Sequence, residues 1–440
     1  MLSSIRTQLP PDVRVVFNSN TSISRRVDAI QSMLKLGYRS GKLGKELTTF
    51  LEFMTAPASK ILDKWFESDI LKATLATDAI IGAKSTRSQF TALFSHSNLV
   101  KVSPSTPGSA YILFHHVMGE VNGVKGMWGH VKGGMGAVSQ ALESVATSYG
   151  AEIVTDAEVK SINIHEGRVC GVTLDNGDEV PAEFVLSNAN PLITMLDLID
   201  QKHLPERVVT HFQKNWNCES ASTKVRYINV ALDSLPNFKC IPNIDDGTIP
   251  MRHHRGTTHF EDSIEMIEDA FLDVQHGFAS RRPVIEMNIP TSLDKSIAPP
   301  AHTLPTGKHV ALLFVQYTPY QPKDGSWDIP GKKEQYADQV FSVIDEYAPG
   351  FKNSIIGYDM LTPPDLERVF SLPKGNIFHG AMGLDQLFWM RPIPGYSDYR
   401  TPIKGLYMSS AGSHPGGGVM GACGRNSAMV CLKDMLGHVA

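Results

Sequence analysis

The sequence has no broad excess of positive charge and no long hydrophobic run. Its formal net charge is −4 at pH 7, which provides no basic field to attract DNA or RNA. A membrane-spanning helix needs about 18 consecutive apolar residues, whereas the richest run, VALLFV at 310–315, has the length of a buried strand. We therefore expect no nucleic-acid partner and no transmembrane segment.

Cysteine is also scarce, and its spacing excludes several kinds of site. The cysteines are odd in number and form no C-x-x-C pair. This pattern argues against a disulfide framework, a zinc ribbon and a pair of redox-active thiols, and it favours a reducing compartment. The five residues are Cys170, Cys218, Cys240, Cys423 and Cys431.

Histidines are present but do not indicate a metal site. His253, His254 and His259 of MRHHRGTTHF lack carboxylate or cysteine partners at ligand spacing, so we interpret this segment as a polar loop. His414 lies beside Pro415 and three glycines, where it either acts as an acid or base or only shapes the turn. No G-x-S-x-G elbow or Walker loop is present.

Length and composition indicate two joined globular domains. A chain of 440 residues is longer than a single hydrophobic core usually supports, and its 42% hydrophobic and 20% charged residues are ordinary for a globular protein. The amino-terminal region is rich in Arg, Lys and Ser. It is compatible either with a transit peptide or with a solvated helix over RRVDAIQSMLKLGY, at 25–38.

The region 126–190 has the clearest pattern. Apolar residues recur at spacings of three and four, and Gly150 follows where a helix would end, so we predict a helix that begins near residue 135. The apolar stripe consists of Met135, Val138, Leu142, Val145 and Tyr149. Predicted strands follow, joined by tight turns into a β-meander. They are AEIVT (151–155), VKSINI (159–164), VCGVTL (169–174) and DEVPAEFVLSNA (178–189).

The region 191–372 mixes amphipathic helices with strands and is predicted to form a separate α+β layer. An apolar sheet face in this layer either holds a ligand or simply buries a core. The predicted strands are STKVRYINVAL (222–232), PVIEMNI (283–289) and HVALLFVQYT (309–318).

Near the carboxyl terminus, SSAGSHPGGGVMGACGRNSA at 409–428 has the form of a glycine loop that opens a helix. The apolar segment at 404–408 predicts a strand directly before it. Free N–H groups and the dipole at a helix N-terminus stabilise an anionic group by roughly 0.3–2 kcal/mol. A tight turn with close packing is the alternative interpretation.

A second glycine cluster at 134–139 resembles the dinucleotide fingerprint G-x-G-x-x-A. It opens the predicted helix and has Asp156 and Glu158 about twenty residues on. The match is weak, because the preceding MWGHVK is a poor buried strand.

Five segments together resemble the phytoene desaturase-like flavoproteins, and the likeness extends from about Val27 onward. The resemblance implies an α/β plus α+β fold of the amine-oxidase and phytoene-desaturase type, in which an incomplete, split FAD-binding domain carries an inserted substrate domain. The segments are LYMSSAGSHPGGGVMGACGRN, GGMGAVSQAL, VLSNANP, ILDKWFESDILKATLATDAIIGA and DMLTPPDLERVFSLPKGNIFHGAM. The implied divisions are a helical linker with a substrate-domain segment (1–125), the FAD-domain helix and meander (126–190), the substrate domain (191–374), and the last FAD-domain strand and helix (375–440).

The resemblance also implies residues that would contact FAD. It places Val159 beside the adenine end and Gly412 beside the ribityl and pyrophosphate groups. Val419, Met420 and Gly421 would direct the helix N-terminus at the pyrimidine edge of the flavin, where reduction places negative charge. It implies no metal site and leaves the catalytic side chain unassigned.

Three features depart from the family pattern. No strand with G-x-G-x-x-G precedes Gly126, so we expect a missing pyrophosphate half-site and FAD affinity that is micromolar at best. We also expect an exposed, unpaired edge along Leu406–Met408. Ser410 stands where the family has glycine and is expected to intrude on the cofactor, and residues 84–105 resemble an insertion. A truncated product, an alternative gene model and loss of the cofactor all stay open.

Two functions follow as hypotheses. The first is an FAD-dependent oxidoreductase that removes hydride from a C–H bond of an apolar small molecule and passes the electrons to oxygen, a quinone or another acceptor. The second is a cofactor-poor relative that acts as a binding or regulatory protein. The resemblance further implies a location in the mitochondrial matrix, with protein partners there.

Overall fold

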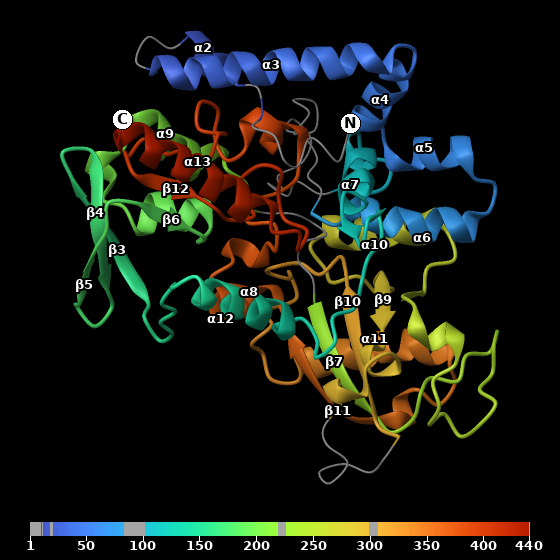
Figure 1. Ribbon diagram of the computed structural model, residues 1–440. Helices are drawn as coiled ribbons and strands as arrows, with labels where there is room; N and C mark the ends of the chain where they lie inside the picture. Colours follow the sequence, from blue (N-terminus) through green and yellow to red (C-terminus); the bar gives the residue numbers. More distant parts are fainter. Residues whose placement is uncertain are drawn as a thin grey trace.

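The structure is a computed structural model that describes residues 10, 12–17, 21–82, 102–218, 226–298 and 307–439. These residues form two lobes (Figure 1). One lobe is built on a five-stranded sheet, and the other on a two-stranded sheet with a three-stranded sheet beside it. The predicted insertion at 84–105 lies almost entirely outside the described residues.

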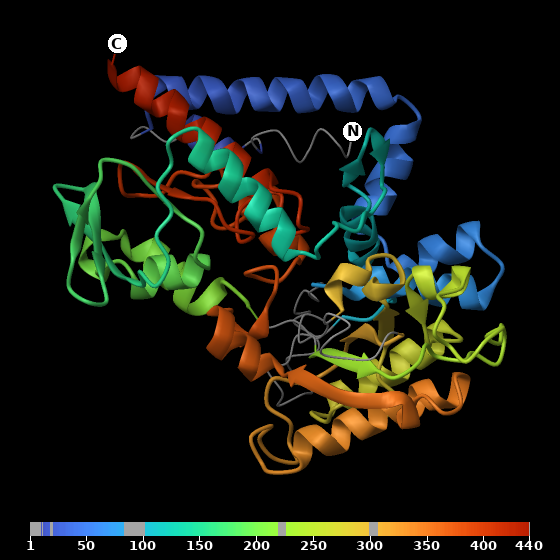
Figure 2. The same ribbon diagram turned by 60° about the horizontal axis from the view of Figure 1, so that its bottom comes forward.

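The five-stranded sheet is antiparallel, in the order β11-β7-β10-β9-β8. Helix α11 covers its outer face (Figure 2). In β10, Ala311, Leu313 and Val315 face the core under α11, whereas Leu312 is 39% exposed on the other face. The three strands predicted here are confirmed, and the strand expected to be buried at 310–315 is buried mainly through the residues that face α11. The elements are β7 (Arg226–Leu232), β8 (Thr258–His259), β9 (Ile285–Asn288), β10 (His309–Val315), β11 (Ile355–Leu361) and α11 (Lys332–Tyr347).

Helices pack around the other side of this lobe (Figure 1). α6 and α10 share a core, and each begins at a serine whose hydroxyl accepts a backbone hydrogen bond: Ser68 from Leu71, and Ser263 from Met266. A short hairpin of β1 and β2 follows α7. The elements are α4 (Glu46–Thr55), α5 (Ala58–Trp65), α6 (Asp69–Ile80), α7 (Ser109–His116), β1 (Glu120–Val121), β2 (Val124–Lys125), α10 (Ile264–Gln275) and α12 (Pro363–Phe370).

The second lobe is centred on β12, which pairs in parallel with β6. Its core contains side chains of β12 together with Met195, Phe212 and Trp216. These three residues lie after position 191, where the substrate domain was predicted to begin, but they pack with β12 of the predicted FAD domain. The meander order β3-β4-β5 is confirmed, but β6 leaves the meander to join β12. The elements are β3 (Val159–His165), β4 (Arg168–Leu174), β5 (Glu179–Pro181), β6 (Val185–Ser187), α9 (Glu206–Thr210), β12 (Leu406–Met408) and α13 (Ala422–Val439), with π-helical turns at Ile193–Asp197 and His211–Asn215.

The edge of β12 is not exposed, so the expected unpaired apolar edge is wrong. All three of its residues are buried, with Leu406 only 1% exposed. On the side away from β6, the Met408 N–H donates to the Tyr399 carbonyl (2.7 Å), and Tyr407 forms a bridge with Arg400. A returning segment of the same lobe thus covers this edge.

The predicted helix is present as α8 (Gly136–Ser148), but its apolar stripe faces solvent. Leu142 is 68% exposed and Tyr149 89% exposed. The strand expected at 151–155 does not form, and Ile153 and Val154 are also exposed. A strand requires a neighbouring strand for its backbone hydrogen bonds, and no described strand pairs with this segment.

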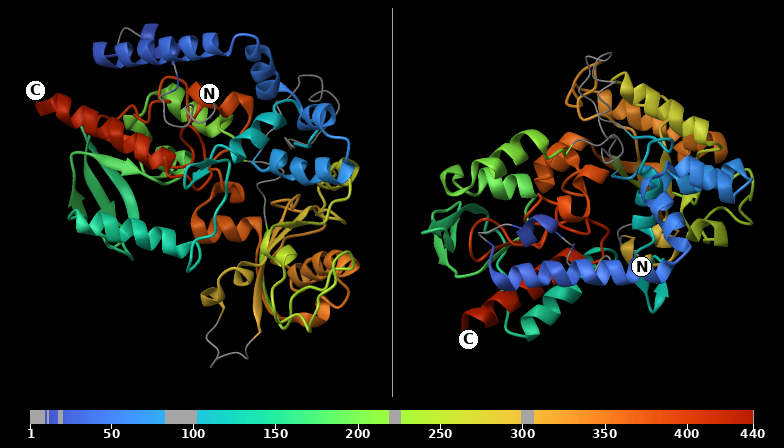
Figure 3. Two further views of the ribbon diagram at one scale, coloured as in Figure 1. Left: turned by 45° about the vertical axis from the view of Figure 1, so that its right-hand side comes forward. Right: turned by 90° about the horizontal axis from the view of Figure 1, so that it is seen from above.

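The amino-terminal region is a long helix, α3 (Ile23–Leu43), preceded by the short α2 (Val13–Phe17). α3 runs across both lobes, as Figure 1 and the view from above in Figure 3 show. The helix expected at 25–38 is therefore confirmed, while a targeting role stays a prediction. None of the described helices is both long and apolar enough to cross a membrane.

Candidate functional site

The glycine loop connects the carboxyl end of β12 to the first residue of α13. Ligands of open α/β sheets bind at the carboxyl ends of parallel strands. Because β12 is buried and parallel to β6, the loop emerges from a fixed position in this lobe. The backbone has positive φ at Gly416 (107°), Gly418 (144°) and Gly421 (64°), and also at Val419 (51°).

The glycines of this loop serve two different purposes. A Cβ atom at Gly412 would lie 2.2 Å from Pro191 Cγ, and one at Gly417 would lie 2.9 Å from Phe378 Cδ1. These two positions therefore need glycine for close packing, which is the alternative interpretation of the loop. A Cβ at Gly421 would meet no atom within 4 Å, so the space directly beside Gly421 is open.

The turn before α13 has the features of a ligand-binding helix terminus. Val419 is 76% exposed and Gly421 is exposed as well, while Met420 is half-buried. The first N–H groups of a helix have no intrahelical acceptor, and the dipole adds positive potential there. The open space beside Gly421 leaves room for a ligand, so the flavin-edge assignment of this turn stays a prediction, whereas the buried Gly412 has a sufficient packing explanation.

Ser410 does not project toward that open space. Its side chain is fully buried, and its hydroxyl accepts a hydrogen bond from the Gly412 N–H (3.2 Å). The hydroxyl thus closes the turn of its own loop, and the expectation that Ser410 would intrude on a cofactor stays a prediction.

Cys423, in the first turn of α13, stabilises the loop and is not an exposed nucleophile. Its thiol donates to the carbonyl of Gly416 (3.3 Å). Burial raises the pKa of this thiol, which keeps it protonated at neutral pH. A cysteine at a helix N-terminus would otherwise be a candidate for activation.

His115 links the helical layer of the first lobe to the glycine loop. It lies on α7, and its Nε2–H donates to the Gly417 carbonyl (2.5 Å). Burial, and then the neighbouring His116, lower the pKa of His115 to about 3. The ring therefore stays neutral, and its buried Nδ1 has no partner among the described residues. No sequence pattern indicated this contact, because its two partners lie 302 residues apart in the chain.

Arg391 is a second residue that sequence reasoning missed. It is fully buried, and its guanidinium donates to five backbone carbonyls, including those of Phe378 (2.6 Å) and Ala411 (2.9 Å). Burial lowers its pKa to about 10, so it remains charged at neutral pH. Arg391 thereby ties the 378–386 segment to the glycine loop.

The structure places four of the five predicted FAD contacts on one loop. Gly412, Val419, Met420 and Gly421 lie between β12 and α13, whereas Val159 starts β3 of the three-stranded sheet. Val159 is the first residue of β3. The other end of β3 pairs with Arg168 of β4, and Arg168 forms an isolated bridge with Lys404, close to β12 in the sequence. These five assignments stay predictions.

The structure shows the contacts of the other candidate sites, and the choice between an acid–base and a turn-shaping role for His414 stays open. Before α8, the Gly133 N–H donates to the Asp294 carboxylate (2.6 Å). Irregular backbone with a few turns occupies 126–135, so the dinucleotide fingerprint lacks the strand that should precede it. His414 is buried, and its carbonyl accepts from the Tyr399 hydroxyl (2.5 Å). No group of three or more metal-ligating side chains occurs in the described part of the chain.

Comparisons with known proteins identify the family. The chain is 48% identical over 418 residues to pyridine nucleotide-disulfide oxidoreductase domain-containing protein 2 of Rattus norvegicus, with 94% of this chain and 67% of the relative aligned. The chain belongs to the family of that protein. It is also 26% identical over 345 residues to the lycopene-forming phytoene desaturase of Pantoea ananas, covering 78% of this chain and 62% of that protein. No family model matches.

The solved structures agree with the fold expected for this family. A structure of putrescine oxidase matches with a TM-score of 0.50 and 15% identity, covering 88% of this chain and 69% of that chain. The predicted α/β and α+β fold of the amine-oxidase type is thus confirmed, and the family is one of FAD-type oxidoreductases. Although the family name mentions disulfides, all five cysteines of this chain are free.

Proposed function

We propose that the protein is an FAD-dependent oxidoreductase that removes hydride from a C–H bond of an apolar small molecule. The observation that carries this proposal is the exposed turn at Val419–Gly421, which directly precedes α13 and has open space beside Gly421. The loop that carries this turn leaves the carboxyl end of a parallel strand in a fold shared with amine oxidases. FAD-type relatives in sequence support the same cofactor.

The residues of the turn would hold and polarise the pyrimidine edge of the flavin. When bound, the flavin would supply the two-electron acceptor for the reaction. The N–H groups at the start of α13 and the helix dipole are fixed in advance, so they stabilise negative charge without reorganising. Gly412, locked against Pro191, and the Cys423 thiol keep this turn in place.

Apolar side chains behind the loop support an apolar substrate. Phe378 and Met382 contact the loop at Gly417 and Gly416, and both belong to a buried aromatic and aliphatic cluster with Tyr111. Such surroundings exclude water and disfavour charged substrates. The electron acceptor is proposed only by class, as oxygen, a quinone or another acceptor.

A second candidate function is that of a cofactor-poor binding or regulatory protein. The exposed apolar stripe of α8 favours it, because exposed apolar patches mark protein-interaction surfaces. Mitochondrial partners and a matrix location are part of either proposal, and the location is tested by fractionation of cells that express the full chain.

One experiment separates the two functions. The chain is purified without added flavin, and its visible absorption is recorded before and after incubation with excess FAD and desalting. A flavin absorption band that stays with the protein after desalting, and is stronger than in a control of FAD without protein, supports the oxidoreductase. A folded protein with no band and no saturable FAD titration supports the binding protein and overturns the oxidoreductase.

A further inference from the structure

Between α3 and α13 lies a cavity of about 330 Å³ that the flavin proposal does not use. Both helices line it, together with Arg400 from the segment before β12. Its volume is at the lower end of the range for small-molecule sites. The charged side chains at the cavity are Asp28, Lys35, Arg400, Arg425 and Lys433.

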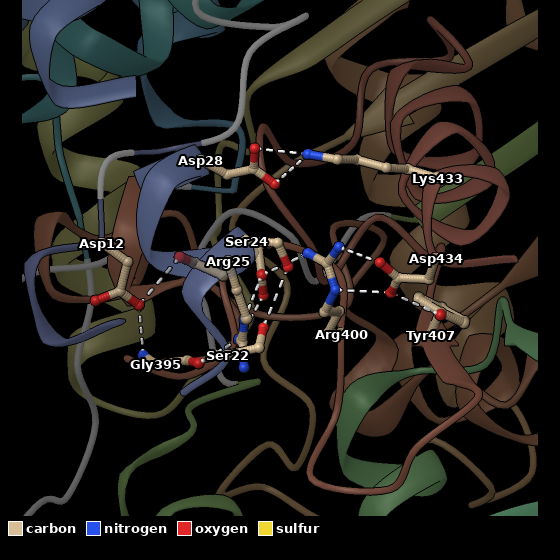
Figure 4. Close-up of polar contacts among 12 residues, drawn as sticks. Asp12, Ser22, Ser24, Arg25, Asp28, Gly395, Arg400, Tyr407, Lys433 and Asp434 are labelled. Atoms are coloured by element: carbon tan, nitrogen blue, oxygen red, sulfur yellow. Dashed lines mark hydrogen bonds and ion pairs between the residues drawn. The ribbon is translucent and has the colours of Figure 1, made fainter. Parts of the chain in front are cut away.

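Most of these charges are already balanced by a network that fixes α3 to the carboxyl-terminal region. The Arg25 guanidinium binds both carboxylate oxygens of Asp398 (2.7 Å each). Arg400 binds both oxygens of Asp434 (2.6 and 2.8 Å). Figure 4 shows this pair next to the third one, in which Lys433 Nζ lies 2.6 Å from each oxygen of Asp28.

These three cations and three carboxylates compensate each other. Arg400 also donates to Asp398 (2.8 Å), which joins two of the pairs into one network. The network holds α3 in place over α13, so the cavity between the helices has defined walls. Because each of these cations is paired with a carboxylate, the network adds little net charge to the cavity.

Two cations at the cavity are not balanced. Lys35, on α3, and Arg425, in the first turn of α13, line the same cavity, and both are exposed. Within the described ranges, no carboxylate lies within 4.0 Å of either side chain. The two positive charges on facing walls repel each other. An anion bound between them would attract both cations and so offset this repulsion.

We propose that this cavity binds a phosphate monoester. A phosphate monoester carries about two negative charges at neutral pH, which matches the two uncompensated cations, and guanidinium groups bind phosphate oxygens in bidentate geometry. Gln31 and Ser32 add uncharged polar groups on the α3 wall, while Met429 and Val430 on α13 provide an apolar surface for the organic part. The site is separate from the flavin turn and does not depend on the proposed redox function.

The ligand would bridge the two helices. Because Lys35 and Arg425 come from opposite walls, a bound phosphate would hold α3 on α13 in addition to the three ion pairs. We therefore expect ligand binding to raise the thermal stability of the protein and to protect α3 from proteolysis.

The test uses phenyl phosphate as a soluble monoester and vesicles of phosphatidylcholine with or without phosphatidic acid as a lipid-borne monoester. Binding of phenyl phosphate is measured by calorimetry at low and high salt, and vesicle binding by co-sedimentation. We expect a dissociation constant below about 1 mM that weakens with salt. The double variant K35Q/R425Q should lose about tenfold or more in affinity.

The matched control is K160Q/R255Q, which removes one exposed lysine and one exposed arginine outside the cavity and should bind as the original protein does. Binding in only one arm identifies the source of the monoester as soluble or lipid-borne. Three results would overturn the proposal: no saturable binding in either arm, equal affinity in K35Q/R425Q, or displacement of phenyl phosphate by FAD, since the last would assign the cavity to the cofactor.

Discussion

In the lobe built on the five-stranded sheet, apolar side chains face a covering helix, whereas in the other lobe α8 turns its apolar stripe to solvent. Leu313 of β10 is completely buried beneath α11, while Leu142 of α8 is 68% exposed. Both residues fit the periodicity of their own element. Periodicity therefore indicates which face is apolar but does not establish that a partner covers it.

The same lobe shows why a helix and a strand respond differently when no partner is present. α8 forms because its backbone hydrogen bonds are internal. The next segment, at 151–155, has the composition of a strand but remains irregular, because a strand needs a second strand to satisfy its backbone. Helix prediction is therefore less dependent on the rest of the fold than strand prediction.

The largest effect is expected at Arg391, which joins the segment of residues 378–386 to the glycine loop. Arg391→Met should lower the free energy of unfolding by about 3–5 kcal/mol, because five buried carbonyls lose their donor. Chemical denaturation measures this change. Arg255→Met, at an exposed position, is the matched control and should change stability by less than about 0.5 kcal/mol.

A pair of leucine substitutions tests the comparison of the two lobes directly. Leu313→Ala should cost about 2–5 kcal/mol, because it leaves a cavity under α11. Leu142→Ala removes the same atoms from an exposed position and should cost less than about 0.5 kcal/mol. Equal losses in urea denaturation would mean that the apolar face of α8 is covered in solution, and the comparison would fail.

The contact between the lobes should depend on pH through His115. Its pKa in the folded protein is about 3, below the ordinary value of 6.5. Between these two pKa values the unfolded chain therefore binds more protons at this side chain than the folded protein does. His115 therefore lowers stability as the pH falls from about 6.5 toward 3, by more than about 1 kcal/mol. His115→Gln should flatten this part of the stability profile, measured by melting temperature in a pH series. An unchanged slope would show that His115 does not remain buried and neutral.

Much of the fold follows from local pattern, and the exceptions have physical causes. The helix at α8 and the strands β3, β4, β7, β9 and β10 were predictable from periodicity. The transfer of β6 from the meander to β12 was not, because pairing partners are set by tertiary structure. The covered edge of β12 was missed for the same reason, since Tyr399 lies in a segment without strand pattern.

The candidate site was predictable only in part. A glycine loop before a helix indicated the turn at Val419–Gly421, and the open space at Gly421 agrees with a ligand there. The sequence alone does not tell which glycine is needed for packing and which lies beside open space. In the structure, the absence of a side chain at Gly412 makes room for Pro191, whereas a Cβ at Gly421 would meet no atom within 4 Å. It also gave no signal for Arg391 or His115, because each acts through contacts with distant backbone carbonyls.

Binding of the flavin edge of FAD at the turn before α13 can be tested by titration. FAD is titrated into the original protein and into the variants Gly421→Asp and Gly421→Asn, with binding followed by flavin fluorescence. Asp and Asn are similar in shape and both tolerate the positive φ at this position, so their difference reports the added charge. We predict saturable binding at micromolar dissociation constants, retained in Gly421→Asn and weakened about tenfold or more in Gly421→Asp. Absence of saturable binding, or equal affinity in the Asp and Asn variants, would contradict the account.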